Sequence, residues 1–384
     1  METHAALPRR GHRTAFVLAF AIAFVVHLLL FCVSPMVGVL MGEMHLSHAQ
    51  FGSVFSASMI SLILFRLPWG LLADRRGYVG VLRVALVLSA SAAGLRAVSQ
   101  GYTGLLVSQF LVGVGLAALM PCLSLMVKAW APDRPGLGTG IYFAGFAVGN
   151  ATALALTPVL LQVMSWRQAF LLYAAVAAVV CLGWFLFGRS GGVVSSSMRL
   201  GDIRLVLRER LVWVLLLLLI GSMGCYDTLA SWMPRVLQMK ELEPGFASLL
   251  PAGFFAAGPV TGLVLDRFRS RRMLVALLGV MAAASIALIS SSSLPLLLLC
   301  LFTAGFATTG VSVVSLTMPV EQGRLSPYAG TVVGFVTSAS NVGPLVVPVL
   351  FGYLIDVTGF YDASLAAVAA LAVVVFIGCS RLMR

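Results

Sequence analysis

Five strongly polar side chains interrupt long apolar stretches of this sequence, away from the ends of those stretches. They are His27, Arg66, Asn150, Asp227 and Asn341. A charged side chain in the middle of a membrane helix costs roughly 2.5–3.5 kcal/mol on insertion scales, so its presence needs a chemical reason. A planar guanidinium suits a bidentate oxyanion, and a buried carboxylate or an imidazole can carry a proton. The set favours recognition of a small polar solute.

The elements that carry these residues are twelve apolar segments. Each is long enough to cross a bilayer as a helix, which takes roughly 20 residues. The composition agrees, because 60% of the residues are hydrophobic, 10% are charged and the mean hydropathy is +1.03. This balance excludes a soluble globular domain. We therefore predict an all-α membrane protein with 12 transmembrane helices, surrounded by a lipid bilayer.

The basic residues predict the orientation of these helices. The 25 lysines and arginines are concentrated in the loops of one side, together with both ends of the chain. The positive-inside rule makes that side cytoplasmic. We expect a bacterial inner-membrane protein with cytoplasmic N- and C-termini. The net charge of +12 is scattered over short loops, so we expect no nucleic acid partner.

The six cysteines all fall in apolar segments without a CxxC pattern. This placement is typical of small buried hydrophobic residues rather than of disulfides or metal ligands. We expect no metal site and no cofactor. His45 and His48 flank a capping-box spacing of Ser47 and Gln50, and we interpret them as loop histidines.

A motif of glycines around an Asp-Arg pair follows the second segment and recurs half of the 384-residue chain later. Its members are Gly70, Asp74, Arg75 and Gly77 in the first copy, and Gly262, Asp266 and Arg267 in the second. Gly77 permits a tight turn because it has no Cβ. The second copy lacks the final glycine and is degenerate.

The two copies belong to a wider internal repeat, in which Asn150 corresponds to Asn341. We therefore predict two pseudo-symmetric six-helix halves, 1–188 and 210–384, joined by a cytoplasmic linker at 189–209. Parallel repeats around a central axis are a transporter architecture, with the solute site near the midplane between them.

The Gly/Asp-Arg motif resembles the loop 2–3 signature of the major facilitator superfamily. Three further features are similar to its nitrate/nitrite porters: Arg66-x-Pro-x-Gly70, Gly149-Asn150 and Ser340-Asn341-Val-Gly343. The Trp232-Met-Pro234 run is similar to cyanate-permease-like anion carriers. The resemblance implies a secondary active transporter that moves a small anionic solute by alternating access, with the motif residues acting as a gate. Nitrate porters carry a second arginine in segment 8, where this chain has Gly258.

We expect the solute to be bound by polar and aromatic side chains at depth: Arg66, His27, Tyr142, Asn150, Tyr226 and Asn341. Asp227 and His27 are the candidates for proton coupling. The alternatives remain open at this point: Arg66 could snorkel or pair with a helix carbonyl, Asp227 could form a salt bridge, and His27 could be structural. Flanking glycines and Pro234 also predict that the segment 210–238 is broken near Asp227.

The alternative within the class is a multidrug/proton efflux antiporter with an aromatic, Met-rich cavity. Such antiporters usually carry an arginine where this chain has Gln109, and a proline where Asn150 follows Gly149. A membrane enzyme would need a clustered nucleophile, base or metal set, which the sequence does not show, so we expect no enzyme. We expect the protein to act as a monomer.

Overall fold

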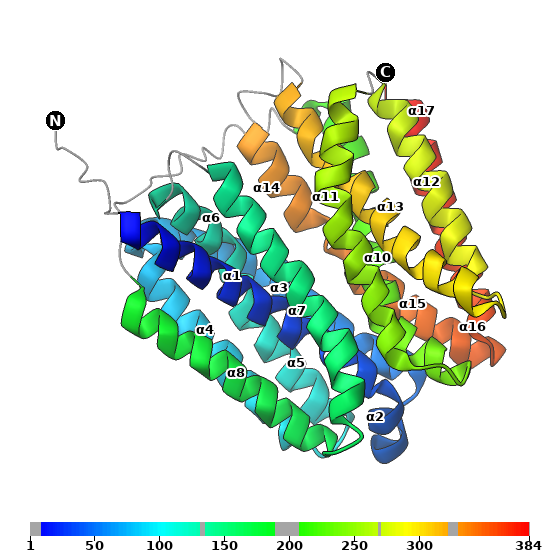
Figure 1. Cartoon of the computed structure of the whole chain (residues 1–384), viewed down its shortest axis with the longest axis horizontal. Coiled ribbons are helices and arrows are strands. Elements are labelled where there is room, and N and C mark those ends of the chain that lie inside the picture. The colour runs from blue at the N-terminus through cyan, green and yellow to red at the C-terminus, as the bar shows by residue number, and fades with distance from the viewer. Residues whose placement is uncertain (1–8, 131–134, 189–206, 268–269, 322–328, 384) are drawn as a thin grey trace.

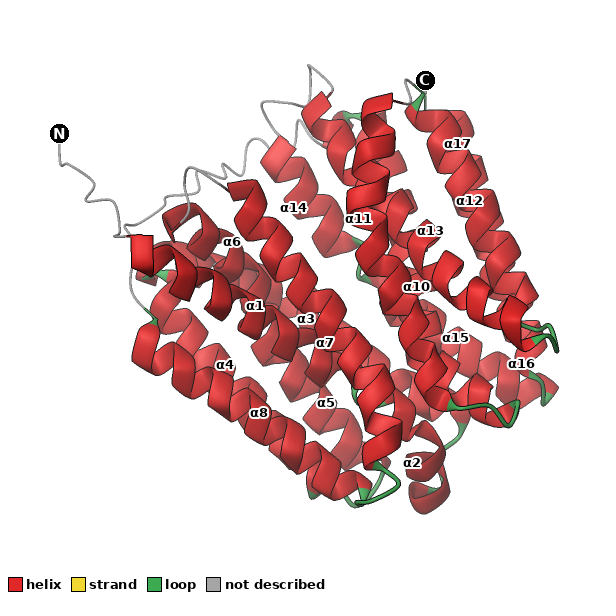
Figure 2. Cartoon of the chain, viewed as in Figure 1, coloured by secondary structure: helices red, strands yellow, loops and turns green. Residues whose placement is uncertain are grey.

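The computed structural model describes residues 9–130, 135–188, 207–267, 270–321 and 329–383, and these ranges are helical with short connections (Figure 2). They contain twelve helical spans long and apolar enough to cross a membrane. The predicted fold class is confirmed: the chain is a multi-pass membrane protein with two pseudo-symmetric six-helix halves.

The first half comprises nine helical elements: α1 (Arg9–Phe31), η1 (Ser34–Met36), α2 (Val37–Met44), α3 (His48–Arg76), α4 (Tyr78–Ala97), α5 (Tyr102–Ala117), α6 (Leu119–Trp130), α7 (Pro135–Leu160) and α8 (Trp166–Phe187). The first span joins α1, η1 and α2, and the fourth joins α5 and α6.

The second half comprises α10 (Arg210–Met239), η2 (Pro244–Ser248), α11 (Leu249–Arg267), α12 (Arg271–Leu288), α13 (Leu294–Glu321), α14 (Ala329–Ala339), α15 (Val342–Thr358), α16 (Tyr361–Ala372), a π-helical turn (Val373–Ile377) and α17 (Gly378–Leu382). Figure 1 shows α1–α8 on one side of the molecule and α10–α17 on the other. Most of the predicted linker lies outside the described residues, so the domain boundaries stay a prediction.

The spans run between two ends of the molecule, which we name by residues. The His48 end is where α3 begins and where α10 and α15 end, and α2 marks it at the bottom of Figure 1. The Gly77 end is where α3 ends and α10 begins. Gly77 turns the chain from α3 into α4 with a φ of 82°, as its lack of a Cβ predicts.

Close helix packing within each half follows the same pattern. In the first half α1 lies against α7, with Gly149 in contact with the Phe24 backbone. In the second half α10 lies against α15, with Gly343 in contact with the Ile220 carbonyl. Small residues let the helix backbones approach, which is how membrane helices gain packing energy.

The expected break in segment 210–238 is wrong, because α10 is one continuous helix through Asp227. Its Gly221 packs against Val375 and its Gly224 against Gly343, so these glycines serve helix contact rather than a hinge. Pro234 removes the backbone N–H that would bond the Ala230 carbonyl, yet α10 continues to Met239.

The break occurs instead in the eleventh span, between α14 and α15. The side chains there compete for backbone carbonyls: Ser340 Oγ donates to the Thr337 carbonyl, and Asn341 Nδ2 donates to the Thr337 and Ser338 carbonyls. Pro344 follows and cannot donate a backbone N–H to the preceding turn. The chain therefore restarts as a new helix at Val342.

Candidate functional site

Asn150 and Tyr226 join the two halves in the middle of the molecule. Asn150 on α7 donates its Nδ2–H to the Tyr226 hydroxyl on α10, at 2.9 Å. Both side chains are buried, and Asn150 is only 1% exposed. Asn150 Oδ1 has no hydrogen-bond partner among the described residues. The Tyr226 ring packs against Phe254 of α11, with 5.4 Å between centroids.

His27 lies against the same face of α7. Its ring stacks on Phe146, with 4.5 Å between centroids, and Phe146 precedes Asn150 by one helical turn. The His27 Nδ1 atom is buried and has no partner in the described part of the chain. Tyr142 lies one further turn along this face and contacts Phe146 edge-on. The structure thus brings four of the predicted site residues to one face of α7.

Arg66 belongs to a second group. Its Nη1 on α3 donates to the Thr337 carbonyl on α14 at 3.3 Å, which links the halves. Asn341 Nδ2 donates to the same carbonyl at 2.9 Å. Arg66 Nε is buried without a partner in the described ranges. One guanidinium N–H therefore pairs with a helix carbonyl, as one of the alternatives allowed.

Asp227 follows Tyr226 on α10 but points to a different face of that helix. Met223, one turn before Asp227, accepts a hydrogen bond from Ser340 Oγ at 3.1 Å, so this face is directed towards the α14–α15 junction. The two ion pairs among the described residues, His48–Asp356 and Arg167–Glu43, do not include Asp227. The Asp227 side chain is partly exposed.

The gating motif is only partly described. Arg75 is exposed at the C-terminus of α3, and Gly70 and Gly262 lie within α3 and α11. The side chains of Asp74, Asp266 and Arg267 lie outside the described side chains. Their predicted role as a latch stays a prediction.

The halves also meet at the His48 end, through residues that we call the His48 seal: His48, Gly52, Trp232, Pro348, Gly352 and Asp356. Asp356 on α15 caps α3 of the other half. Its Oδ1 accepts from the His48 backbone N–H at 3.0 Å and lies 2.8 Å from His48 Nδ1, and its Oδ2 accepts from the Ala49 N–H at 2.8 Å. The interpretation of His48 as a loop histidine is therefore wrong.

Close packing surrounds this cap. A Cβ on Gly52 would lie 2.6 Å from the Pro348 carbonyl, and Gly352 contacts the His48 carbonyl. Trp232 donates its indole N–H to the Pro348 carbonyl at 3.0 Å and lies near the His48 ring. The capping box of Ser47 and Gln50 is confirmed, and it gave the one local signal that α3 begins here.

Arg96 is a buried cation that the sequence analysis did not single out. It is 0% exposed and lies in the last turn of α4. Its Nη1 donates to the Leu29 carbonyl at 2.8 Å and lies 3.3 Å from Cys32 Sγ, and its guanidinium lies over the Phe170 ring. These contacts are all within the first half, so Arg96 braces α4 against α1 and α8. All six cysteines are buried, as expected.

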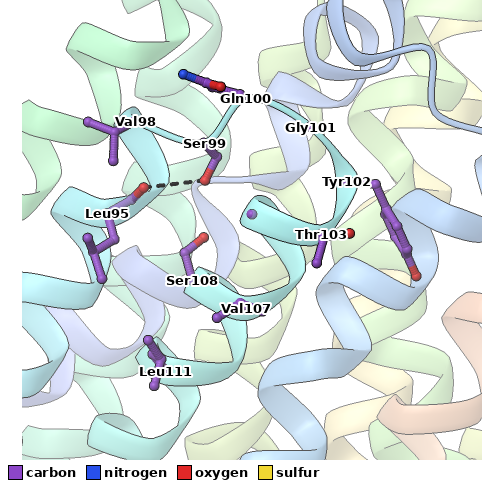
Figure 3. Close-up of a pocket in the computed structure, with 11 residues that line it drawn as sticks. Leu95, Val98, Ser99, Gln100, Gly101, Tyr102, Thr103, Val107, Ser108 and Leu111 are labelled. Carbon is purple, nitrogen blue, oxygen red and sulfur yellow. Dashed lines mark hydrogen bonds between the residues drawn. The ribbon is translucent and has the colours of Figure 1, made fainter.

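A shallow groove of about 520 Å³ lies at the turn between α4 and α5, where Ser99 donates to the Leu95 carbonyl (Figure 3). Its lining contains none of the site residues described above. It lies at the His48 end and within a single half, so it has no part in the site between the halves.

The chain belongs to the Major Facilitator Superfamily, which matches its residues 19–321 and 246–383. It is similar to solved structures of two transporters of this fold. A bacterial homologue of the human lysosomal transporter Spinster, in an inward-facing and unoccupied conformation, covers 98% of this chain and 98% of that one with a TM-score of 0.81 and 16% identity. A mutant of the nucleoside transporter NupG covers 96% of this chain and 100% of its own, with a TM-score of 0.78 and 12% identity.

Its relatives in sequence are transporters as well. A nitrite extrusion protein of Bacillus subtilis is 25% identical over 90% of this chain and 88% of its own length. A D-galactonate transporter of Escherichia coli is 25% identical over 88% of each chain. A probable sulfoacetate transporter of Cupriavidus necator is 26% identical over 83% of this chain and 82% of its own.

Proposed function

We propose that this chain is a secondary active transporter that moves a small anionic solute across a bacterial inner membrane by alternating access of its halves. The observation that supports the proposal most directly is the position of Arg66. The Arg66 guanidinium is held between the two halves, with one N–H on the Thr337 carbonyl, a buried Nε without a partner and no carboxylate among the described ion pairs. A cation in this position provides binding energy for an anion in a medium that screens charge poorly.

The names of the relatives support an anion, because nitrite, D-galactonate and sulfoacetate are all negatively charged. We assign the Gly77 end to the cytoplasm, because the basic loops favour that orientation. The His48 seal would then close the path towards the outside. Alternation would require this seal to separate while the halves close at the Gly77 end.

Proton coupling is part of the proposal, with Asp227 and His27 as the carriers. Asp227 is partly exposed, is not in either described ion pair and lies beside Tyr226. His27 lies on the α7 face that carries Asn150 and keeps a buried, unpartnered Nδ1. A carboxylate and an imidazole near a solute site can exchange protons as the site opens to each side.

The test is ligand binding and uptake by the purified full chain. A bound anion should raise the melting temperature, because a ligand that binds only the folded state stabilises it by mass action. Arg66→Ala should lower uptake into proteoliposomes about tenfold to hundredfold, since a charge-assisted hydrogen bond contributes about 1.5–3 kcal/mol. Arg381→Ala is the matched control, because Arg381 is exposed at the end of α17. Normal anion uptake by Arg66→Ala would refute the assignment.

The aromatic cluster of Tyr142, Phe143 and Phe146 favours a second candidate, export of lipophilic compounds. In that case lipophilic cations should stabilise the protein, and Arg66→Ala should not change the shift. The same screen therefore separates the two functions.

A further inference from the structure

We propose that the midplane site takes an organic acid that carries a hydroxyl group, rather than a bare inorganic oxyanion. This inference rests on the proposed function, because it assumes that Arg66 binds the acid group. It goes further by proposing that Asn150 and Tyr226 bind a second polar group of the solute, its hydroxyl. We call the acid group and this hydroxyl the two poles of the solute.

The hydrogen-bond inventory of this pair leaves one acceptor atom, Asn150 Oδ1, and two donors, the second N–H of Asn150 Nδ2 and the Tyr226 hydroxyl. Asn150 uses an Nδ2–H on the Tyr226 oxygen, and its Oδ1 is buried without a partner in the described part of the chain. A tyrosine hydroxyl that accepts a hydrogen bond still has its own proton to donate. The pair therefore presents an accepting oxygen and a donating hydroxyl next to each other.

An alcohol matches both groups, because its O–H donates to Asn150 Oδ1 and its oxygen accepts from Tyr226. An ionised inorganic oxyanion such as nitrate or nitrite has acceptors only. It would leave Asn150 Oδ1 buried without a donor and would place negative charge against that oxygen. Sites built to hydrogen-bond a hydroxyl discriminate strongly against analogues without it, because the buried group of the site is left unpaired.

The positions of the two poles along their helices also favour an extended solute. Arg66 lies about 15 Å along α3 from the Gly77 end, and Asn150 lies about 22 Å along α7 from the same end, at 1.5 Å per residue. The difference of about 7 Å in depth exceeds the span of a three- or four-atom inorganic anion. A hydroxy acid with a chain of three to six carbons can reach both.

The surroundings provide apolar walls and space for such a carbon chain. Phe254 packs on Tyr226, and Phe146 stacks on His27. Gly258 follows Phe254 by one turn of α11, and a Cβ added there would meet no atom within 4 Å. The face of α11 is therefore open at Gly258, one turn from the residue that packs on Tyr226.

The test compares acids that differ only by hydroxyl groups, using the purified full chain. The pairs are 4-hydroxybutyrate and butyrate, 6-hydroxyhexanoate and hexanoate, and tartrate and succinate, with nitrate and nitrite as inorganic probes. Thermal shift and competition binding give a Kd for each. We expect the hydroxylated member of at least one pair to bind about tenfold more tightly or better, and nitrate and nitrite to bind more weakly than that acid.

Two variants assign the preference to this pair of residues. Tyr226→Phe keeps the ring on Phe254 and removes only the O–H, so the affinity ratio should fall towards one. Asn150→Leu should reduce the same ratio through loss of the acceptor. Tyr173→Phe is the matched control, because the Tyr173 hydroxyl bonds Thr157 within the first half, and it should keep the ratio of the unaltered protein.

The outcomes separate this inference from the proposed function. Equal binding of hydroxylated and deoxy acids, both dependent on Arg66, would overturn the inference and leave the anion transporter in place. Tighter binding of nitrate or nitrite than of any hydroxy acid would overturn it in the same way. If Tyr226→Phe left the affinity ratio of hydroxylated to deoxy acids unchanged, the hydroxyl of the solute would be bound by other residues, and the assignment to Tyr226 would be wrong. Stabilisation by lipophilic cations alone would overturn both proposals.

Discussion

At the His48 end the two halves meet backbone to backbone, whereas at mid-depth they meet through a few polar side chains. In the His48 seal, both Asp356 oxygens are satisfied by partners on the opposite half, and Gly52 lets the Pro348 carbonyl approach. At mid-depth, Asn150 Oδ1, His27 Nδ1 and Arg66 Nε are buried without a partner among the described residues.

In the described residues of the seal, His48 Nε2 is the one buried side-chain atom without a hydrogen-bond partner, whereas the mid-depth interface has three such atoms on three different helices. Unpaired buried polar atoms cost about 1–3 kcal/mol each, so each of the three mid-depth atoms would gain from a ligand that pairs with it. In a transporter that works by alternating access, the contacts of the seal must be stable enough to keep the halves together in one conformation. They must also be weak enough to separate during the transport cycle. Under the proposed function, we expect the seal to affect the population of conformations and the mid-depth residues to affect recognition.

The largest effect is expected from Gly352→Leu, which breaks the seal by bulk. Its side chain would clash with the His48 carbonyl in this state, and overpacking typically costs about 1–3 kcal/mol. The ratio of the two conformations should shift by about thirtyfold towards the state that is open at the His48 end. Spin labels at Gln100→Cys and Ser292→Cys, exposed at this end of each half, would report the longer distance.

Gly80→Leu is the control for this change, because a Cβ at Gly80 meets no atom within 4 Å. It should leave the distance distribution unchanged. The six buried native cysteines limit background labelling. An unaltered distance in Gly352→Leu, with the protein still folded, would contradict the assignment of the seal.

A smaller shift is expected from Asp356→Asn. The amide retains one acceptor oxygen and loses the charge that faces two backbone N–H groups of α3. We expect about 1 kcal/mol less stabilisation of the sealed state, a shift of about fivefold, because the site is partly exposed to solvent. The same spin-label pair measures it, and Asp362→Asn, at the start of α16, serves as control.

The smallest effect is expected from His48→Gln. This change removes the imidazole contact and leaves both backbone N–H bonds to Asp356 in place. The distance distribution should shift less than in Asp356→Asn, by about twofold or less. A larger shift in His48→Gln than in Asp356→Asn would mean that the ring, not the helix cap, holds the halves together.

Substitutions in the mid-depth region should change ligand affinity and leave the distance between the halves unchanged. Tyr226→Phe should change the affinity for hydroxylated acids and leave the spin-label distance of the ligand-free protein near its original value. Asp356→Asn should move the distance and leave the ratio of affinities between a hydroxy acid and its deoxy partner unchanged. If Tyr226→Phe changed the spin-label distance, or if Asp356→Asn changed the ratio of affinities, the two regions would not have the separate roles that we expect.

Much of the fold could be predicted because it depends on short-range patterns. Apolar segments of the right length, the repeat of the glycine and Asp-Arg motif, and the Ser47 capping box each involve neighbouring residues or a simple count. The one error of this type, the break expected in α10, arose because glycine supports both hinges and close packing. Only the contacts of Gly221 and Gly224 with other helices distinguish these roles.

The site was predicted as a set of residue types but not as an arrangement. His27, Arg66, Asn150 and Asp227 stand out because polar groups in a membrane helix are costly. Their division into an α7 group with Tyr226 and a separate Arg66–Thr337–Asn341 group could not be inferred, because it depends on how two halves dock. Asp356 was missed for the same reason, since its partner His48 lies 308 positions away.

The sequence by itself determined the class of protein, the number of spans and the two-fold repeat, because a bilayer forces every backbone hydrogen bond to be satisfied within helices. Tertiary structure alone decided which polar atoms meet and which remain unpaired, since side chains on different helices are placed by packing and not by spacing along the chain. Asn150 shows both: its position in an apolar segment marks it as costly, and only the contact with Tyr226 shows which of its atoms has no hydrogen-bond partner among the described residues.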